Sequence, residues 1–73
     1  MVSKQKKQDK YGLTQRELSV LQRLLMGDSY KMVAGTLEIS IGTVYSHINH
    51  IYKKMQVNSK TEAVIKAIRE NLV

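Results

Sequence analysis

The segment ISIGTVYSHINHIYKKM, residues 39–55, carries two different patterns on one expected helix. Apolar residues recur every three or four positions, which is the spacing of one helix face, and they are Ile41, Val44, Ile48, Ile51 and Met55. The opposite face holds Gly42, Tyr45, Ser46, Asn49 and Lys53. This second face has a cation and an aromatic ring but no acidic residue. We therefore expect a helix over residues 41–55 that is anchored by its apolar face and presents its polar face to a partner.

The composition limits the class of protein to which the chain can belong. It has 73 residues, no cysteine and no proline, so we expect one small domain that is stabilised by packed helices rather than by disulfides. No apolar run approaches the roughly 18 residues that a membrane span needs. No signal-peptide pattern follows the N-terminus. We therefore expect a soluble, cytoplasmic protein with no membrane partner.

The charge of the chain points to a polyanionic partner. The net charge is +6 and the pI is near 9.8, which favours nucleic acid. An anionic membrane surface is less favoured, because Trp and Phe anchors are absent. Four of the twelve basic residues lie within residues 1–10, which have almost no apolar content. We therefore expect residues 1–10 to be a disordered basic tail or linker stub and residues 11–73 to form the folded domain.

Capping residues and apolar periodicity predict four helices, over residues 15–26, 30–37, 41–55 and 60–71. The expected N-caps are Thr14, Ser29, Ser40 and Ser59. Glu17 and Glu62 follow the first and last of these caps by three residues and complete two capping boxes. Gly27 suits a left-handed helix end.

The same periodicity predicts a single shared core. Outside residues 41–55, the residues expected to point inward are Leu18, Leu21, Leu24, Leu25, Val33, Ala34, Leu37, Ala63, Val64, Ala67 and Ile68. Gly35 costs about 1 kcal/mol relative to Ala within a helix, which indicates either close packing against a neighbouring element, the interpretation we favour, or a cost that the helix simply tolerates. The expected fold class is therefore all-α, with four helices and no wing.

A short helix, a three-residue turn and a longer helix form the helix-turn-helix arrangement. The second helix of this motif enters the major groove of B-DNA, which is about 12 Å wide, and presents side chains to base edges. At about 100° per residue, positions 42, 45, 46, 49 and 53 converge on one arc of residues 41–55. We therefore expect the acid-free face to lie against DNA.

Residues 13 to about 68 resemble the DNA-binding domain of LuxR/FixJ/NarL-type (GerE-like) bacterial transcription regulators. The matching motifs are LTQRE, LLMGDSYK, IS before TV, the histidine three residues after TV, and KKMQVNSKTEAV. Each motif is weak alone, but together, in this order and spacing, they are specific. The resemblance implies the output domain of a regulator, often of the response-regulator type, which recognises DNA with its third helix and dimerises largely through its fourth.

Members of this family usually carry an N-terminal receiver or ligand-sensing domain, which this chain lacks. We therefore expect either an excised C-terminal domain or a small free-standing regulator. The lysine-rich start suits a linker stub and favours the excised domain.

The resemblance places base-facing residues at Tyr45, Ser46 and Asn49. Asn49 can bond the N6 and N7 edge of adenine, which is worth about 1–3 kcal/mol of discrimination. The family commonly has Lys at the position of Tyr45, whose ring can instead stack, touch a thymine methyl or donate one hydrogen bond. The family also often has Glu at the position of Met32 and Arg at that of Lys60. We therefore expect a preferred DNA sequence that differs from those of better-known relatives.

Side chains at helix starts and along the edge of residues 41–55 are the expected phosphate contacts. They are Lys31, Thr43, His50, Lys53, Ser59 and Lys60. Lys54 points more to the side, and we expect it to be solvated only. His47 and His50 are not expected to bind a metal, because a structural zinc takes four ligands and no cysteine is present. We expect no cofactor, and no catalytic arrangement that would indicate an enzyme.

A second, smaller apolar row on the last expected helix, Ile65 and Leu72 with Arg69 between them, favours a weak homodimer through residues 60–71. A two-fold dimer would place two recognition helices about one turn of DNA apart on an inverted-repeat operator.

The alternative to sequence-specific DNA binding is a helical interaction module that docks on RNA polymerase and has only weak, non-specific DNA contact.

Overall fold

Four α-helices make up the computed structural model of the protein, which describes residues 10–72. They are α1 (Gln15–Leu25), α2 (Tyr30–Leu37), α3 (Ile41–Met55) and α4 (Lys60–Arg69). No strand occurs among the described residues, and the all-α fold class is confirmed. Helices α2 and α3 have the predicted limits, whereas α1 and α4 end slightly earlier than predicted. Residues 1–9, most of the expected basic tail, lie outside the described residues, so that expectation stays a prediction.

Side-chain caps begin the helices at the predicted positions. The Oγ1 atom of Thr14 accepts a hydrogen bond from the N–H of Glu17 at 3.1 Å, and Oε1 of Glu17 accepts one from the N–H of Thr14 at 2.9 Å. This capping box is confirmed. Ser59 caps α4, but the Glu62 carboxylate accepts from the N–H of Asn58 at 2.7 Å rather than from Ser59. The second capping box is therefore only half formed.

The turns between helices bend at left-handed residues. Gly27, after α1, has φ +93, as its predicted role requires. Helices α2 and α3 end instead at Glu38 and Gln56, with φ 59 and 58, so the turns on both sides of α3 use non-glycine residues in a conformation that L-residues rarely adopt. The sharp turn at Glu38 brings α3 back against α2.

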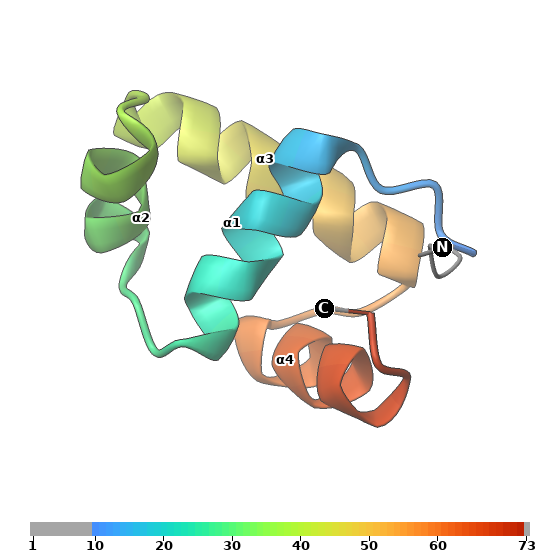
Figure 1. Ribbon diagram of the computed structural model, residues 1–73. Helices are drawn as coiled ribbons and strands as arrows, with labels where there is room; N and C mark the ends of the chain where they lie inside the picture. Colours follow the sequence, from blue (N-terminus) through green and yellow to red (C-terminus); the bar gives the residue numbers. More distant parts are fainter. Residues whose placement is uncertain (1–9, 73) are drawn as a thin grey trace, which may run out of the picture.

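Helix α3 packs against both α1 and α2, and α4 packs against α1. Figure 1 shows α2 at the left, near the beginning of α3, and α4 at the lower right. The buried core is continuous through all four helices. It consists of Leu13, Val20, Leu21, Leu24, Val33, Val44, Ile48, Ile51, Met55, Val57, Ala63 and Ala67. One face of α3 is therefore fully used in packing, which fixes the direction of the opposite face.

Three local expectations were wrong. Ile41 is 42% exposed, because it occupies the helix end one turn before Val44, the first buried residue of α3. Ile68 is 62% exposed, because α4 packs through a narrow strip and Ile68 lies about 100° around the helix from Ala67. A Cβ atom added to Gly35 would meet no atom within 4 Å, so close packing does not explain that glycine.

No helix within residues 10–72 has both the length and the apolar character needed to cross a membrane.

Candidate nucleic-acid interface

The outward face of α3 carries the side chains that were predicted to meet base edges. Tyr45 is 49% exposed, and Ser46 and Asn49 are also exposed. Lys53 continues the same face toward the end of the helix and is exposed too. Within residues 10–72, no hydrogen bond or ion pair occupies the side chains of Ser46, Asn49 or Lys53. The hydrogen-bond donors of all three side chains therefore face solvent and are available to a partner. The same holds for the acceptor oxygens of Ser46 and Asn49.

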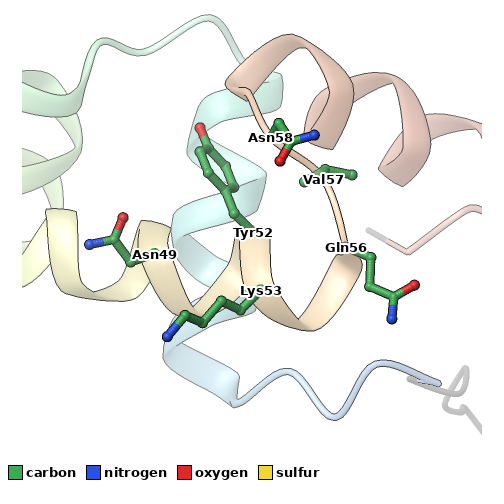
Figure 2. Close-up of a pocket in the computed structure, with 6 residues that line it drawn as sticks. All are labelled: Asn49, Tyr52, Lys53, Gln56, Val57 and Asn58. Carbon is green, nitrogen blue, oxygen red and sulfur yellow. The ribbon is translucent and has the colours of Figure 1, made fainter.

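A shallow depression borders this face along the second half of α3. Figure 2 shows that Asn49 and Lys53 project from α3 on one side of it. The ring of Tyr52 points away from them, and Asn58 lies beyond it, after the end of α3. The depression thus joins the outward face of α3 to the loop that leads into α4.

A second depression borders α3 between Gly42 and His50. It is lined by Thr14, Glu17, Ser40, Gly42, Thr43, Ser46, His47 and His50. Most of these side chains are hydroxyls or imidazoles, which can bond to phosphate oxygens. The Oγ1 of Thr43 is also 2.9 Å from the Oγ of Ser40, which caps α3. Thr43 and His50, two of the predicted phosphate contacts, therefore flank the base-facing side chains.

The remaining predicted phosphate contacts lie at the starts of α2 and α4. Lys31 and Ser59 are exposed. Lys60 is less available, because its Nζ donates to the carbonyl oxygen of Asp28 at 3.3 Å and lies 5.7 Å from the centre of the Tyr30 ring. Contact of these residues with DNA stays a prediction, and Ser59 also has a partner already, because its Oγ accepts from the N–H of Glu62 at 3.2 Å.

Lys54 was expected to be solvated only, and this was wrong. Its Nζ donates to Oε1 of Glu17 at 2.7 Å and to the carbonyl oxygen of Gly12 at 3.0 Å. Glu17 is only 3% exposed, and Nδ1 of His50 lies 3.8 Å from its Oε2. Burial acts to raise the pKa of Glu17, but hydrogen bonds from Lys54 and the Thr14 N–H, with the nearby positive charge, hold it below its usual value. This cluster ties the start of α1 to α3.

Three tyrosines form a second cluster that the sequence reasoning missed. The rings of Tyr30 and Tyr45 are 5.4 Å apart at an interplanar angle of 82°, an edge-to-face contact. The hydroxyl oxygens of Tyr30 and Tyr52 are 2.8 Å apart and hydrogen-bonded. Burial and this hydrogen bond raise the pKa of Tyr52. The cluster joins α2 to two points on α3, including one of the predicted base-facing residues.

The exposed row on α4 differs from the predicted one. Ile65 and Ile68 are 51% and 62% exposed, and Arg69 is exposed beside them. Leu72 instead packs partly against the core. The chain reverses at Asn71, which has φ 58, and the N–H of Leu72 donates to the carbonyl of Ala67 at 3.0 Å. This turn carries Leu72 back onto the domain, so Ile68 takes its place in the outer row.

Comparisons with known proteins agree with this fold. Residues 11–67 match the model of the family described as bacterial regulatory proteins, luxR family. The chain is 43% identical over 61 residues to the transcriptional regulatory protein DegU of Brevibacillus brevis, across 84% of this chain and 26% of that protein. It is 38% identical over 61 residues to the response regulator protein VraR of Staphylococcus aureus, across 84% of this chain and 29% of that protein.

A solved structure is similar over nearly the whole chain. The crystal structure of response regulator ChrA, of a heme-sensing two-component system, matches with a TM-score of 0.81 and 36% sequence identity. The match covers 94% of this chain and 33% of ChrA, so the chain spans a third or less of each of these relatives. The chain belongs to the luxR family of bacterial regulatory proteins and is a helix-turn-helix DNA-binding domain of the kind that response regulators carry.

Proposed function

We propose that this domain binds double-stranded DNA sequence-specifically, with α3 in the major groove, and so acts in the cytoplasm as the output domain of a bacterial response regulator. One observation carries the proposal: the outward face of α3 is exposed, has no acidic residue, and holds polar side chains without partners among residues 10–72. Such a face suits contact with base edges between two rows of phosphates. Membership of the luxR family supports the same assignment.

In this proposal Tyr45, Ser46 and Asn49 contact bases. Six residues contact phosphates, namely Lys31, Thr43, His50, Lys53, Ser59 and Lys60. Phosphate contacts set the position of the domain on the duplex, whereas base contacts select the sequence. The two groups should therefore respond differently to mutation.

Asn49→Ala and Lys53→Ala are expected to separate these two roles. Asn49→Ala should remove about 1–3 kcal/mol of preference at one base pair, because a bidentate contact to a base edge is lost. Lys53→Ala should weaken binding to every duplex alike and reduce the slope of log affinity against log salt by about 1. Fluorescence anisotropy with a selected duplex, single-base variants and a random duplex, across a salt series, measures both effects.

Gln22→Ala is the matched control, because Gln22 is an exposed carboxamide on α1 rather than on α3. It should change neither quantity. Equal affinity of the wild-type protein for every duplex, unchanged by Asn49→Ala, would instead favour the alternative function, a module that docks on RNA polymerase with weak, non-specific DNA contact.

We further propose that two copies pair weakly through α4 on an inverted-repeat operator. Ile65, Ile68 and Arg69 form an exposed row there. The apolar part of this row is small, so pairing should be weak in solution and strengthened when two domains bind adjacent half-sites.

Ile68→Asp is expected to weaken binding to a two-half-site duplex by about 5-fold or more, the range of a typical coupling free energy. Affinity for a single half-site should stay unchanged, because Ile68 is not on α3. Electrophoretic mobility shifts on the two duplexes measure the difference. Met26→Asp changes another exposed apolar residue, 69% exposed at the end of α1, and should leave both affinities unaltered. Equal losses on both duplexes for Ile68→Asp would rule out this pairing surface.

A further inference from the structure

We infer that Tyr30 is a positioning residue that holds the Tyr45 ring in the orientation with which it reads a base. This inference rests on the proposed function, because it assigns Tyr45 to a base contact. Tyr30 itself begins α2 and is half-buried against the core. It acts on the duplex only through Tyr45.

The contact between the two rings defines a preferred orientation. Their centres are 5.4 Å apart and their planes are at 82°, which is the edge-to-face geometry favoured by the charge distribution of aromatic rings. Tyr45 is 49% exposed, so about half of its surface stays accessible to a partner while it contacts Tyr30. A solvated tyrosine would sample several staggered χ1 wells. The contact with Tyr30 favours one of them.

Tyr30 can act as a fixed support because it is held at several points. Its hydroxyl is hydrogen-bonded to that of Tyr52 at 2.8 Å, and Nζ of Lys60 lies 5.7 Å from its ring centre. Tyr45 and Tyr52 are seven residues apart on α3, so they leave the helix in nearly the same direction. The Tyr52 ring points away from Asn49 and Lys53 (Figure 2). One ring from α2 thus contacts Tyr45 and Tyr52, which lie about two turns apart along the edge of the outward face of α3.

A ring that is already oriented loses less rotational freedom when DNA binds. Its position relative to the bases is also defined more narrowly, so a wrong base meets the ring in an unfavourable geometry. Tyr45 is therefore expected to discriminate between bases, by stacking or by contact with a thymine methyl. This discrimination should depend on Tyr30, although Tyr30 does not reach the base. Among residues 10–72, no hydrogen bond or ring contact joins Asn49 to Tyr30, so the discrimination by Asn49 should be independent of Tyr30.

Duplex selection followed by affinity measurements on every single-base variant tests this inference. The proteins are the wild type, Tyr45→Ala, Tyr30→Leu, Tyr30→Phe and the double variant with Tyr45→Ala and Tyr30→Leu. Tyr45→Ala identifies the base pairs that Tyr45 reads. Tyr30→Leu should reduce discrimination at those same pairs by about 2- to 10-fold, the range for one aromatic pair. Discrimination at the pairs read by Asn49 should be unchanged.

Tyr30→Phe keeps the ring contact and loses only the hydroxyl bond, so it should restore most of the discrimination. In the Tyr45→Ala background, Tyr30→Leu should have no further effect on discrimination at the base pairs that Tyr45 reads. A uniform loss on all duplexes, or equal effects of Tyr30→Leu with and without Tyr45, would overturn the inference while leaving the proposed function intact. Absence of any sequence preference in the wild type would overturn the proposed function, and the inference with it.

If Tyr30→Leu does not fold, the free wild-type protein decides the question. Three-bond NMR couplings should show one dominant χ1 rotamer for Tyr45, whereas averaging over several rotamers would overturn the inference.

Discussion

Ile51→Ala is expected to destabilise the domain by about 2–5 kcal/mol, the range for removing a buried isoleucine side chain down to Cβ. Ile51 is fully buried in the middle of α3, and the core around it is contributed by all four helices. A domain of this size has roughly 4–11 kcal/mol of total stability, taking about 0.05–0.15 kcal/mol per residue. One substitution should therefore remove a large part of the free energy of unfolding.

Urea unfolding followed by circular dichroism measures this loss. Ile65→Ala is the matched control, because Ile65 is 51% exposed on α4, and its effect should be below about 1 kcal/mol. Comparable losses from the two substitutions would contradict the assignment of the inner face of α3 to the core. The packing of the inner face of α3 into the core sets the direction of its outward face. The stability result therefore also tests which side of α3 is available to DNA.

Lys54→Met is expected to cost about 2–3 kcal/mol at pH 7. It keeps an unbranched side chain but leaves the buried Glu17 carboxylate without its cation. Breaking a fully buried ion pair costs about 3–5 kcal/mol, and we expect less here because a third of the Lys54 side chain is exposed. Lys53→Met, at the next position, is the control, since Lys53 has no ion pair among the described residues.

The loss caused by Lys54→Met should depend on pH. Glu17 has a lowered pKa in the folded protein, so the wild-type ion pair contributes its full stability above the usual value of 4.5 and loses it as the pH falls through the lower, folded pKa. The difference between wild type and variant should therefore shrink between pH 7 and pH 3. Urea unfolding at both pH values measures it. An equal deficit at the two pH values would show that Lys54 acts through packing rather than through charge.

Local signals in the sequence were sufficient for the helices. The starts of α2 and α3 were predicted correctly because Ser29 and Ser40 cap them through side-chain bonds to backbone N–H groups nearby in the chain. The direction of the outward face of α3 followed from the 3.6-residue period, because the core takes the opposite face. Both features depend on interactions within a few residues.

Contacts between distant residues could not be predicted in the same way. The Glu17–Lys54 pair joins positions 37 residues apart, and the Tyr30–Tyr52 hydrogen bond joins positions 22 apart. No periodicity within one helix encodes such a pairing. Ile68 was misplaced for a related reason: the period gives the direction of a side chain, but not how far the neighbouring helix extends to cover it.

The central claim is that the outward face of α3 lies in the major groove, and intermolecular NMR contacts test it most directly. The chain, isotopically labelled, would be bound to an unlabelled duplex selected from a random pool. We predict nuclear Overhauser contacts from the Tyr45 ring and the Asn49 side-chain amide to base protons of the major groove. Contacts to DNA that come instead from Ile65 and Ile68 on α4, with the α3 side chains unchanged from the free protein, would contradict the account.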